Sequence, residues 1–153
     1  LSVASAAAIW KRLQSAHMTK AKAIMSADDD TLRAAGLSRQ KIRYARALAA
    51  SGIDFTRLRQ CDDAEVFSVL TEVSGIGVWT AEIYAMFSLL RPDIFAPGDL
   101  ALQEAARSLF DLPQRPKERA LRQMAEAWSP WRSVAARLLW AYYAVIKNKE
   151  GIA

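Results

Sequence analysis

The turn Gly75-Ile76-Gly77 constrains the fold of this chain more than any other feature. It separates two apolar segments in which hydrophobic residues recur three and four positions apart, as they do along one face of an α-helix. Glycine accepts a positive φ angle without a Cβ clash, so a Gly-x-Gly sequence lets the chain reverse direction within a few residues. The sequence therefore predicts a helical hairpin between about residue 62 and about residue 90.

Helical spacing also dominates the rest of the chain, and the alternation typical of strands is absent. Cap and stop residues such as Ser38, Gly36 and Pro130 divide it into short segments. We expect an all-α fold of about eight to ten short helices, over about 3–13, 18–25, 28–36, 38–52, 62–73, 78–90, 99–110, 117–128 and 130–147. Residues 29–49 weakly echo residues 62–87, because both read as acidic cap, helix, glycine turn and helix.

Composition limits the class of protein. The 153 residues are 52% hydrophobic and contain no linker-like tract, so we expect a single domain over 1–153. No apolar run reaches the roughly eighteen residues of a membrane span, and we expect no membrane partner. Because the sequence opens directly on a helix-like apolar pattern, we also expect N-terminal elements of the fold to precede Leu1.

Single cysteine and histidine residues exclude several kinds of site. Cys61 alone cannot form an internal disulfide, a four-cysteine metal site or an iron–sulfur cluster, and it favours an intracellular, reducing compartment. His17 alone cannot build a histidine metal cluster or a Ser-His-Asp triad. The sequence therefore predicts no metal bound by side chains.

The net charge of +5 permits a polyanionic partner without requiring one. Lysine and arginine gather near residues 11–22, 39–46 and 115–122. From charge alone, solvated helix faces are the favoured explanation of these clusters.

The glycine turn can bind phosphate through its backbone. A helix that starts after such a turn has unpaired N–H groups and a partial positive charge at its N-terminus. We expect this site to comprise Ser74, Gly75, Ile76, Gly77, Val78 and Thr80. Carbonyl oxygens of the turn could in addition coordinate Na⁺ or K⁺. An ordinary helical hairpin with no ligand is the alternative.

Two stretches resemble one known family. "LTEVSGIGVWTAEI" resembles the helix–hairpin–helix motif, and "RPDIFAPGDLAL" resembles the Gly/Pro-rich loop with an aspartate that follows it in the helix–hairpin–helix–GPD (HhH-GPD) superfamily of base-excision DNA glycosylases. "LSVASAAAIWKRL", "GLSRQKIRYARALA" and "WSPWRSVAARLLWAYY" resemble its alkylpurine branch, the 3-methyladenine DNA glycosylase II type. The resemblance covers nearly the whole chain.

The resemblance implies a fold, a partner and an activity. The fold would be the HhH-GPD fold, with the active-site cleft between two helical sub-lobes. The enzyme would flip a 3-methyladenine- or 7-methylguanine-type base out of duplex DNA and hydrolyse its N-glycosidic bond, leaving an abasic site. It would be a monomer, in the cytoplasm or nucleoid of a bacterium or in the nucleus of a eukaryote. No organic cofactor is implied.

One position separates the branches of this family. The bifunctional glycosylase/lyases have a catalytic lysine two residues after the second glycine of the hairpin, and here Trp79 stands at that position. The resemblance therefore implies a monofunctional enzyme in which water is the nucleophile.

The same resemblance implies that Asp99 is the catalytic carboxylate. An alkylated purine is already cationic and leaves readily, so the protein has chiefly to stabilise the oxocarbenium-like sugar and to orient or deprotonate the attacking water. From the residues alone, Pro-Gly-Asp ahead of a helical segment favours a plain N-cap. One side chain can do both.

An electron-poor alkylated purine binds best between aromatic rings. The resemblance places Trp79 and Trp140 in the base pocket, and Tyr84 and Tyr143 are close enough in sequence to contribute. Ile83 and Leu100 replace aromatic residues of some relatives. The apolar wedge that such enzymes insert into DNA would lie at or before Leu1.

Two alternatives remain open. The chain could be a non-catalytic helix–hairpin–helix DNA-binding module, in which Asp99 only caps a helix, or a glycosylase for other damaged bases. An all-α scaffold without a nucleic-acid partner remains if neither of these holds. Indoles of Trp79 and Trp140 buried away from Asp99 would favour the non-catalytic module.

Overall fold

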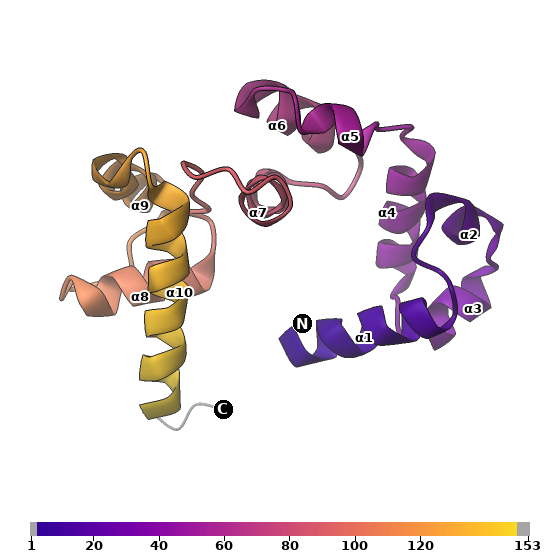
Figure 1. Ribbon diagram of the computed structural model, residues 1–153. Helices are drawn as coiled ribbons and strands as arrows, with labels where there is room; N and C mark the ends of the chain where they lie inside the picture. The colour runs from indigo at the N-terminus through magenta and orange to yellow at the C-terminus, as the bar shows by residue number, and fades with distance from the viewer. Residues whose placement is uncertain (1–2, 150–153) are drawn as a thin grey trace. The chain divides into compact units, whose positions relative to one another are not determined.

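The computed structural model describes residues 3–149, which contain ten α-helices, one 3₁₀ turn and no strand (Figure 1). The chain divides into two compact units: one ends at Ile76 and the other begins at Gly77. The all-α class and the number of helices are as the sequence predicts. That the units form a single domain, with a cleft between two lobes, stays a prediction.

The first unit contains six helices: α1 (Val3–Ser15), α2 (Ala21–Ser26), α3 (Asp29–Ala34), α4 (Arg39–Ala50), α5 (Phe55–Leu58) and α6 (Asp63–Thr71). Four of them begin at a side-chain cap that accepts hydrogen bonds from first-turn N–H groups, namely Asp28, Ser38, Asp54 and Asp62. Helix α5 was not predicted, because four residues are too few to show helical periodicity.

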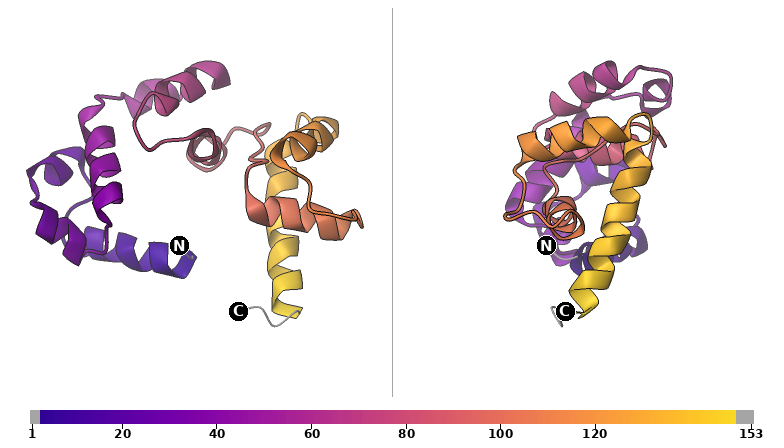
Figure 2. Two further views of the ribbon diagram at one scale, coloured as in Figure 1. Left: turned by 180° about the vertical axis from the view of Figure 1, so that it is seen from behind. Right: turned by 90° about the vertical axis from the view of Figure 1, so that its left-hand side faces the viewer.

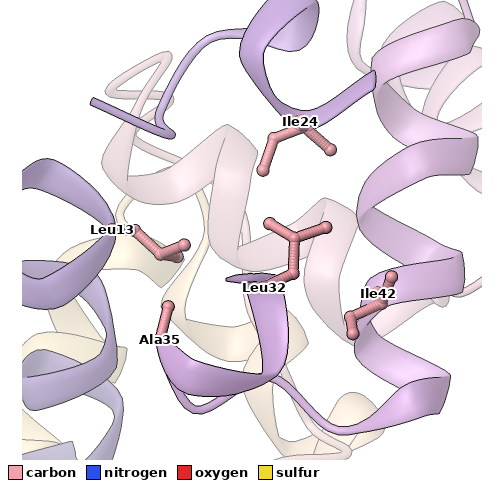
Figure 3. Close-up of a cluster of buried hydrophobic side chains, with 5 residues drawn as sticks. All are labelled: Leu13, Ile24, Leu32, Ala35 and Ile42. Carbon is pink, nitrogen blue, oxygen red and sulfur yellow. The ribbon is translucent and has the colours of Figure 1, made fainter. Parts of the chain in front are cut away.

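Buried aliphatic side chains hold α1 to α4 together. Leu13, Ile24, Leu32, Ala35 and Ile42 converge from the four helices, and Leu32 is fully buried (Figure 3). Burying one such leucine contributes roughly 1.5–3 kcal/mol relative to leaving it exposed. The core thus fixes the position of α4, and the Tyr44 ring of this helix lies against Gly75 of the hairpin.

The second unit contains α7 (Val78–Phe87), α8 (Leu100–Leu109), α9 (Glu118–Ala125), the 3₁₀ turn η1 (Glu126–Trp128) and α10 (Arg132–Lys149). Helices α8 and α10 cross in contact, as both views in Figure 2 show. Small or branched side chains at their interface, including Leu102, Ala105, Ala106 and Ala136, are almost completely buried. No helix in the described range is long and apolar enough to cross a membrane.

Helix α7 ends three residues earlier than the sequence predicts. The N–H groups of Ser88 and Leu89 both donate to the Tyr84 carbonyl, and Leu90 takes a left-handed conformation (φ +57°). This closes the helix as a glycine usually does. Because leucine gives no such signal, the periodic pattern runs on past the true end.

Candidate active site

The loop that leads to Asp99 is anchored to the start of α10. Ser133 is buried, and its hydroxyl accepts from the Ile94 N–H (3.0 Å) and lies 2.7 Å from the Arg91 carbonyl oxygen. The Arg132 guanidinium binds both carboxylate oxygens of Asp93, at 2.7 and 2.8 Å. The hydrogen bonds from Arg132 are the main reason why the pKa of Asp93 is well below its usual range. The loop is therefore fixed before it reaches Asp99.

Asp99 caps α8 and also binds two tryptophans. Its Oδ1 accepts from the backbone N–H groups of Ala101 (2.9 Å) and Leu102 (3.1 Å). The Trp140 indole Nε1–H donates to the same oxygen at 3.1 Å, and the Trp79 indole Nε1–H donates to Oδ2, also at 3.1 Å. The side chains come from α7, α8 and α10, so three helices converge on one carboxylate.

The four hydrogen bonds are divided unequally between the oxygens. Oδ1 accepts three, which exceeds the two lone pairs of a carboxylate oxygen, whereas Oδ2 accepts only one. Asp99 is half-buried and the Trp79 side chain is 48% exposed. Oδ2 therefore keeps capacity for a further partner.

Trp140 is packed against an aromatic and cationic stack. The Phe87 ring lies 5.7 Å from the Trp140 ring, and the Arg137 guanidinium lies 4.6 Å from the centre of the Phe87 ring. Arg137 also donates to the Met86 carbonyl at the end of α7. This stack limits rotation of the indole away from Asp99.

A buried carboxylate on α7, one helical turn after Trp79, is structural. Glu82 is 3% exposed and accepts from the Arg122 guanidinium of α9 at 3.0 Å. Burial raises the pKa of Glu82, and Arg122 partly offsets this. The pair holds α7 against α9 and so supports Trp79.

The hairpin offers backbone N–H groups. In the first unit, Gly75 has φ +92°, and the Ile76 N–H closes a turn on the Val73 carbonyl. In the second unit, Gly77 caps α7 without a side chain, and the N–H groups of Val78, Trp79 and Thr80 have no hydrogen-bond partner among the described residues. Gly77 has φ −93°, so only Gly75 needs the conformational freedom of glycine that we expected of the turn.

A family model matches residues 1–130, and its description is HhH-GPD superfamily base excision DNA repair protein. The chain belongs to the HhH-GPD superfamily. The resemblance of the hairpin and of the loop before Asp99 to this superfamily is thereby confirmed.

Relatives support the same assignment. The chain is 33% identical over 122 residues to DNA-3-methyladenine glycosylase 1 of Schizosaccharomyces pombe, which covers 76% of this chain and 54% of that protein. It spans about half the length of the curated relatives it matches.

Two solved structures have the same HhH-GPD fold. DNA-3-methyladenine glycosidase from Bacillus halodurans is 34% identical, with a TM-score of 0.80 over 97% of this chain and 71% of that one. The S. pombe 3-methyladenine DNA glycosylase Mag1 in complex with abasic DNA is 29% identical, with a TM-score of 0.84 over 92% of this chain and 72% of that one.

Within this HhH-GPD chain, the predicted site residues do not all meet. Asp99, Trp79 and Trp140 form one hydrogen-bonded cluster. The sequence predicts that these residues belong to one site, but it does not predict the hydrogen bonds between them. Tyr84 on α7 and Tyr143 on α10 are half-buried, and neither hydrogen-bonds to Asp99. Their part in a base pocket stays a prediction, and the expected wedge lies outside the described residues.

Sequence reasoning missed the residues that support this cluster. The sequence does not single out Asp93, Phe87 or Arg137. For Ser133 and Arg132 it leaves open support of the pocket, a contact with the phosphate backbone, or a structural role. The partners of these residues are up to 53 residues away in the sequence, as for Phe87 and Trp140. Only the Pro-flanked position of Asp93 and the aromatic content of α7 hinted at them. In the described range, no group of three or more His, Cys, Asp or Glu side chains could hold a metal ion.

Proposed function

We propose that this chain is a monofunctional DNA glycosylase that hydrolyses the N-glycosidic bond of alkylated purines in duplex DNA and acts as a monomer. The cluster of Asp99 with the indoles of Trp79 and Trp140, in a chain of the HhH-GPD superfamily, is the observation that best supports this proposal. The names of the relatives support the same substrate class.

Asp99 would act on charge rather than by forming a bond. As the C1′–N bond of a flipped nucleotide lengthens, the sugar becomes positive, and a fixed carboxylate beside it lowers the barrier. The bonds to Ala101, Leu102 and Trp140 hold Oδ1 in place, and Oδ2 remains to face the sugar or the attacking water. A base that is already cationic leaves without protonation, so this site needs no general acid.

Trp79 would line the base pocket and exclude lyase chemistry. Its ring is half-exposed beside Asp99, where it can stack on an electron-poor base. No lysine occurs in residues 74–80, so the hairpin has no amine that could form a Schiff base with the deoxyribose.

The hairpin would bind the DNA backbone. The unpaired N–H groups at the start of α7 can hold a phosphate. Carbonyl oxygens of the turn would hold Na⁺ or K⁺, whose positive charge would favour binding of the DNA backbone. Both tryptophans bond to Asp99, which argues against the module in which Asp99 is only a cap.

Release of free methylated base from alkylated duplex DNA tests the proposal. The wild type should release 3-methyladenine and 7-methylguanine, and Asp99→Asn should lower the rate on the order of 100-fold or more. Borohydride should trap no covalent adduct. An active Asp99→Asn enzyme would overturn the mechanism, and release of only oxidised or deaminated bases would establish the alternative substrate class.

A further inference from the structure

Two glycine turns in the first unit have the same construction. Gly36 follows α3, Gly75 follows α6, and both have left-handed φ angles (+103° and +92°). A side chain from an earlier helix covers each glycine so closely that a Cβ there would overlap it. Arg12 of α1 covers Gly36, and Tyr44 of α4 covers Gly75.

The side chains that cover the two glycines, Arg12 and Tyr44, differ in charge and in the hydrogen bonds that they make. The side chain over Gly36 is the positively charged Arg12, and its Nε–H donates to the Ala35 carbonyl at 2.8 Å. At Gly75 the cover is a neutral ring whose hydroxyl accepts from the Gln40 amide at 2.7 Å. The Arg43 guanidinium lies 5.6 Å from the centre of that ring. Gly75 and the Arg43 guanidinium therefore both lie next to the Tyr44 ring.

Within the described part of the fold Arg43 makes no ion pair, in contrast to two other arginines of this unit. Arg46 bonds to Asp29 at 2.7 Å and Arg57 bonds to Glu65 at 2.7 Å, so their charges are neutralised within the fold. Arg43 is exposed and has no hydrogen bond or ion pair with any described residue. Its five N–H donors remain available to an anion, and a guanidinium suits the geometry of a phosphate.

We propose that Arg43 binds a DNA phosphate next to the Gly75 turn, and that Tyr44, whose ring contacts both Gly75 and the Arg43 guanidinium, is the residue that positions Arg43. This inference rests on the proposed function, because it takes DNA as the ligand. It adds a side-chain charge to a hairpin that otherwise binds phosphate through backbone groups. Affinity should then depend on salt more steeply than the hairpin amides alone would require.

The test measures the affinity of a duplex containing a stable abasic-site analogue by fluorescence anisotropy over a series of KCl concentrations. Arg43→Gln should weaken binding roughly tenfold at low salt and reduce the slope of log K against log[KCl] by about 0.9. Arg43→Lys should keep the slope. Lys22→Gln is the matched control, since it removes one exposed positive charge from α2 and should leave the slope unchanged.

Tyr44 variants test positioning separately. Tyr44→Phe keeps the ring and should bind within about twofold of the wild type, because only the bond to Gln40 is lost. In a Tyr44→Leu background, Arg43→Gln should have a smaller effect than in the wild type, as expected for residues that act together. Thermal melting checks that each variant is folded.

The outcomes separate this inference from the proposed function. If the wild type binds DNA and releases base while Arg43→Gln keeps the full slope, the phosphate contact is wrong and the function stands. Equal losses in Arg43→Gln and Lys22→Gln would reduce the effect to net charge and also overturn the contact. A wild type that neither binds duplex DNA nor releases base contradicts the proposed function itself.

Discussion

Asp62 in the first unit and Asp99 in the second occupy the same local position. Each is the N-cap of a helix, in extended backbone conformation, and each accepts a hydrogen bond from a first-turn N–H group. Asp62 has that one bond, to Glu65, at 2.8 Å. Asp99 accepts two backbone bonds and, in addition, two indole N–H bonds from helices α7 and α10. The same local role as an N-cap thus occurs in both places, but only Asp99, for which we propose a catalytic role, also binds side chains that are distant in the sequence.

We expect the largest effect when each of these two aspartates is replaced by asparagine and the rates of base release are compared. Asparagine caps a helix about as well as aspartate, so Asp99→Asn and Asp62→Asn should both keep their helices. Asp99→Asn also removes the negative charge beside the sugar and should lower single-turnover base release on the order of 100-fold or more. Asp62→Asn should leave that rate unchanged. Equal rates for the two variants would mean that Asp99 is only a cap.

The next effect concerns the indole N–H groups that distinguish Asp99. Trp140→Phe and Trp79→Phe keep an aromatic ring for the base but remove one hydrogen bond to a charged acceptor, which typically contributes about 1.5–3 kcal/mol. We expect kcat to fall roughly tenfold or more with little change in KM, and more for the half-buried Trp140 than for the exposed Trp79.

Trp131→Phe is the matched control for these variants. Trp131 immediately precedes α10 and is 61% exposed, and its N–H and C=O groups bond only within the turn to Trp128, Val134 and Ala135. Its replacement should leave kcat unchanged. A tenfold rise in KM at constant kcat in Trp140→Phe would indicate that Trp140 binds the base without positioning Asp99.

The sequence predicts the local role of a helix cap such as Asp62 better than it predicts the contacts of Asp99. Ser38 as a cap follows from local rules, and the same rules place the start of α6 at Asp62 or Asp63, because capping needs only residues three positions away. Asp99 and Trp79 were found through the hairpin and loop motifs. Their hydrogen bond was not, since an indole on α7 meets a carboxylate 20 residues later only after both helices have packed. The contacts of Ser133, Phe87 and Arg137 join segments still farther apart, and no periodicity encodes them.

A third effect should appear in stability, and it concerns the loop that holds Asp99. Arg132→Gln removes the two-point ion pair with Asp93, which is partly exposed, so we expect a loss on the order of 1 kcal/mol at neutral pH. The pKa of Asp93 is lowered in the folded state, so its contribution is present above the unfolded value of about 4 and is lost as the pH falls below it. Urea unfolding at pH 7 and at pH 3 should show a difference between wild type and variant that shrinks at acidic pH. A constant difference would assign the effect to packing instead.

The smallest effect returns to Asp62, where removal of the cap should lower stability without lowering the rate. Asp62→Ala leaves the Glu65 N–H without its acceptor and should cost about 1 kcal/mol of unfolding free energy. Base release measured well below the melting temperature should stay at the wild-type rate, because the Asp62 carboxylate binds the N–H of Glu65 in its own helix and takes no part in the Asp99 cluster. Urea unfolding and single-turnover kinetics on the same preparation separate the two quantities. A rate loss in Asp62→Ala that Asp62→Asn does not share would show that α6 fixes the hairpin and that capping and activity are coupled through it.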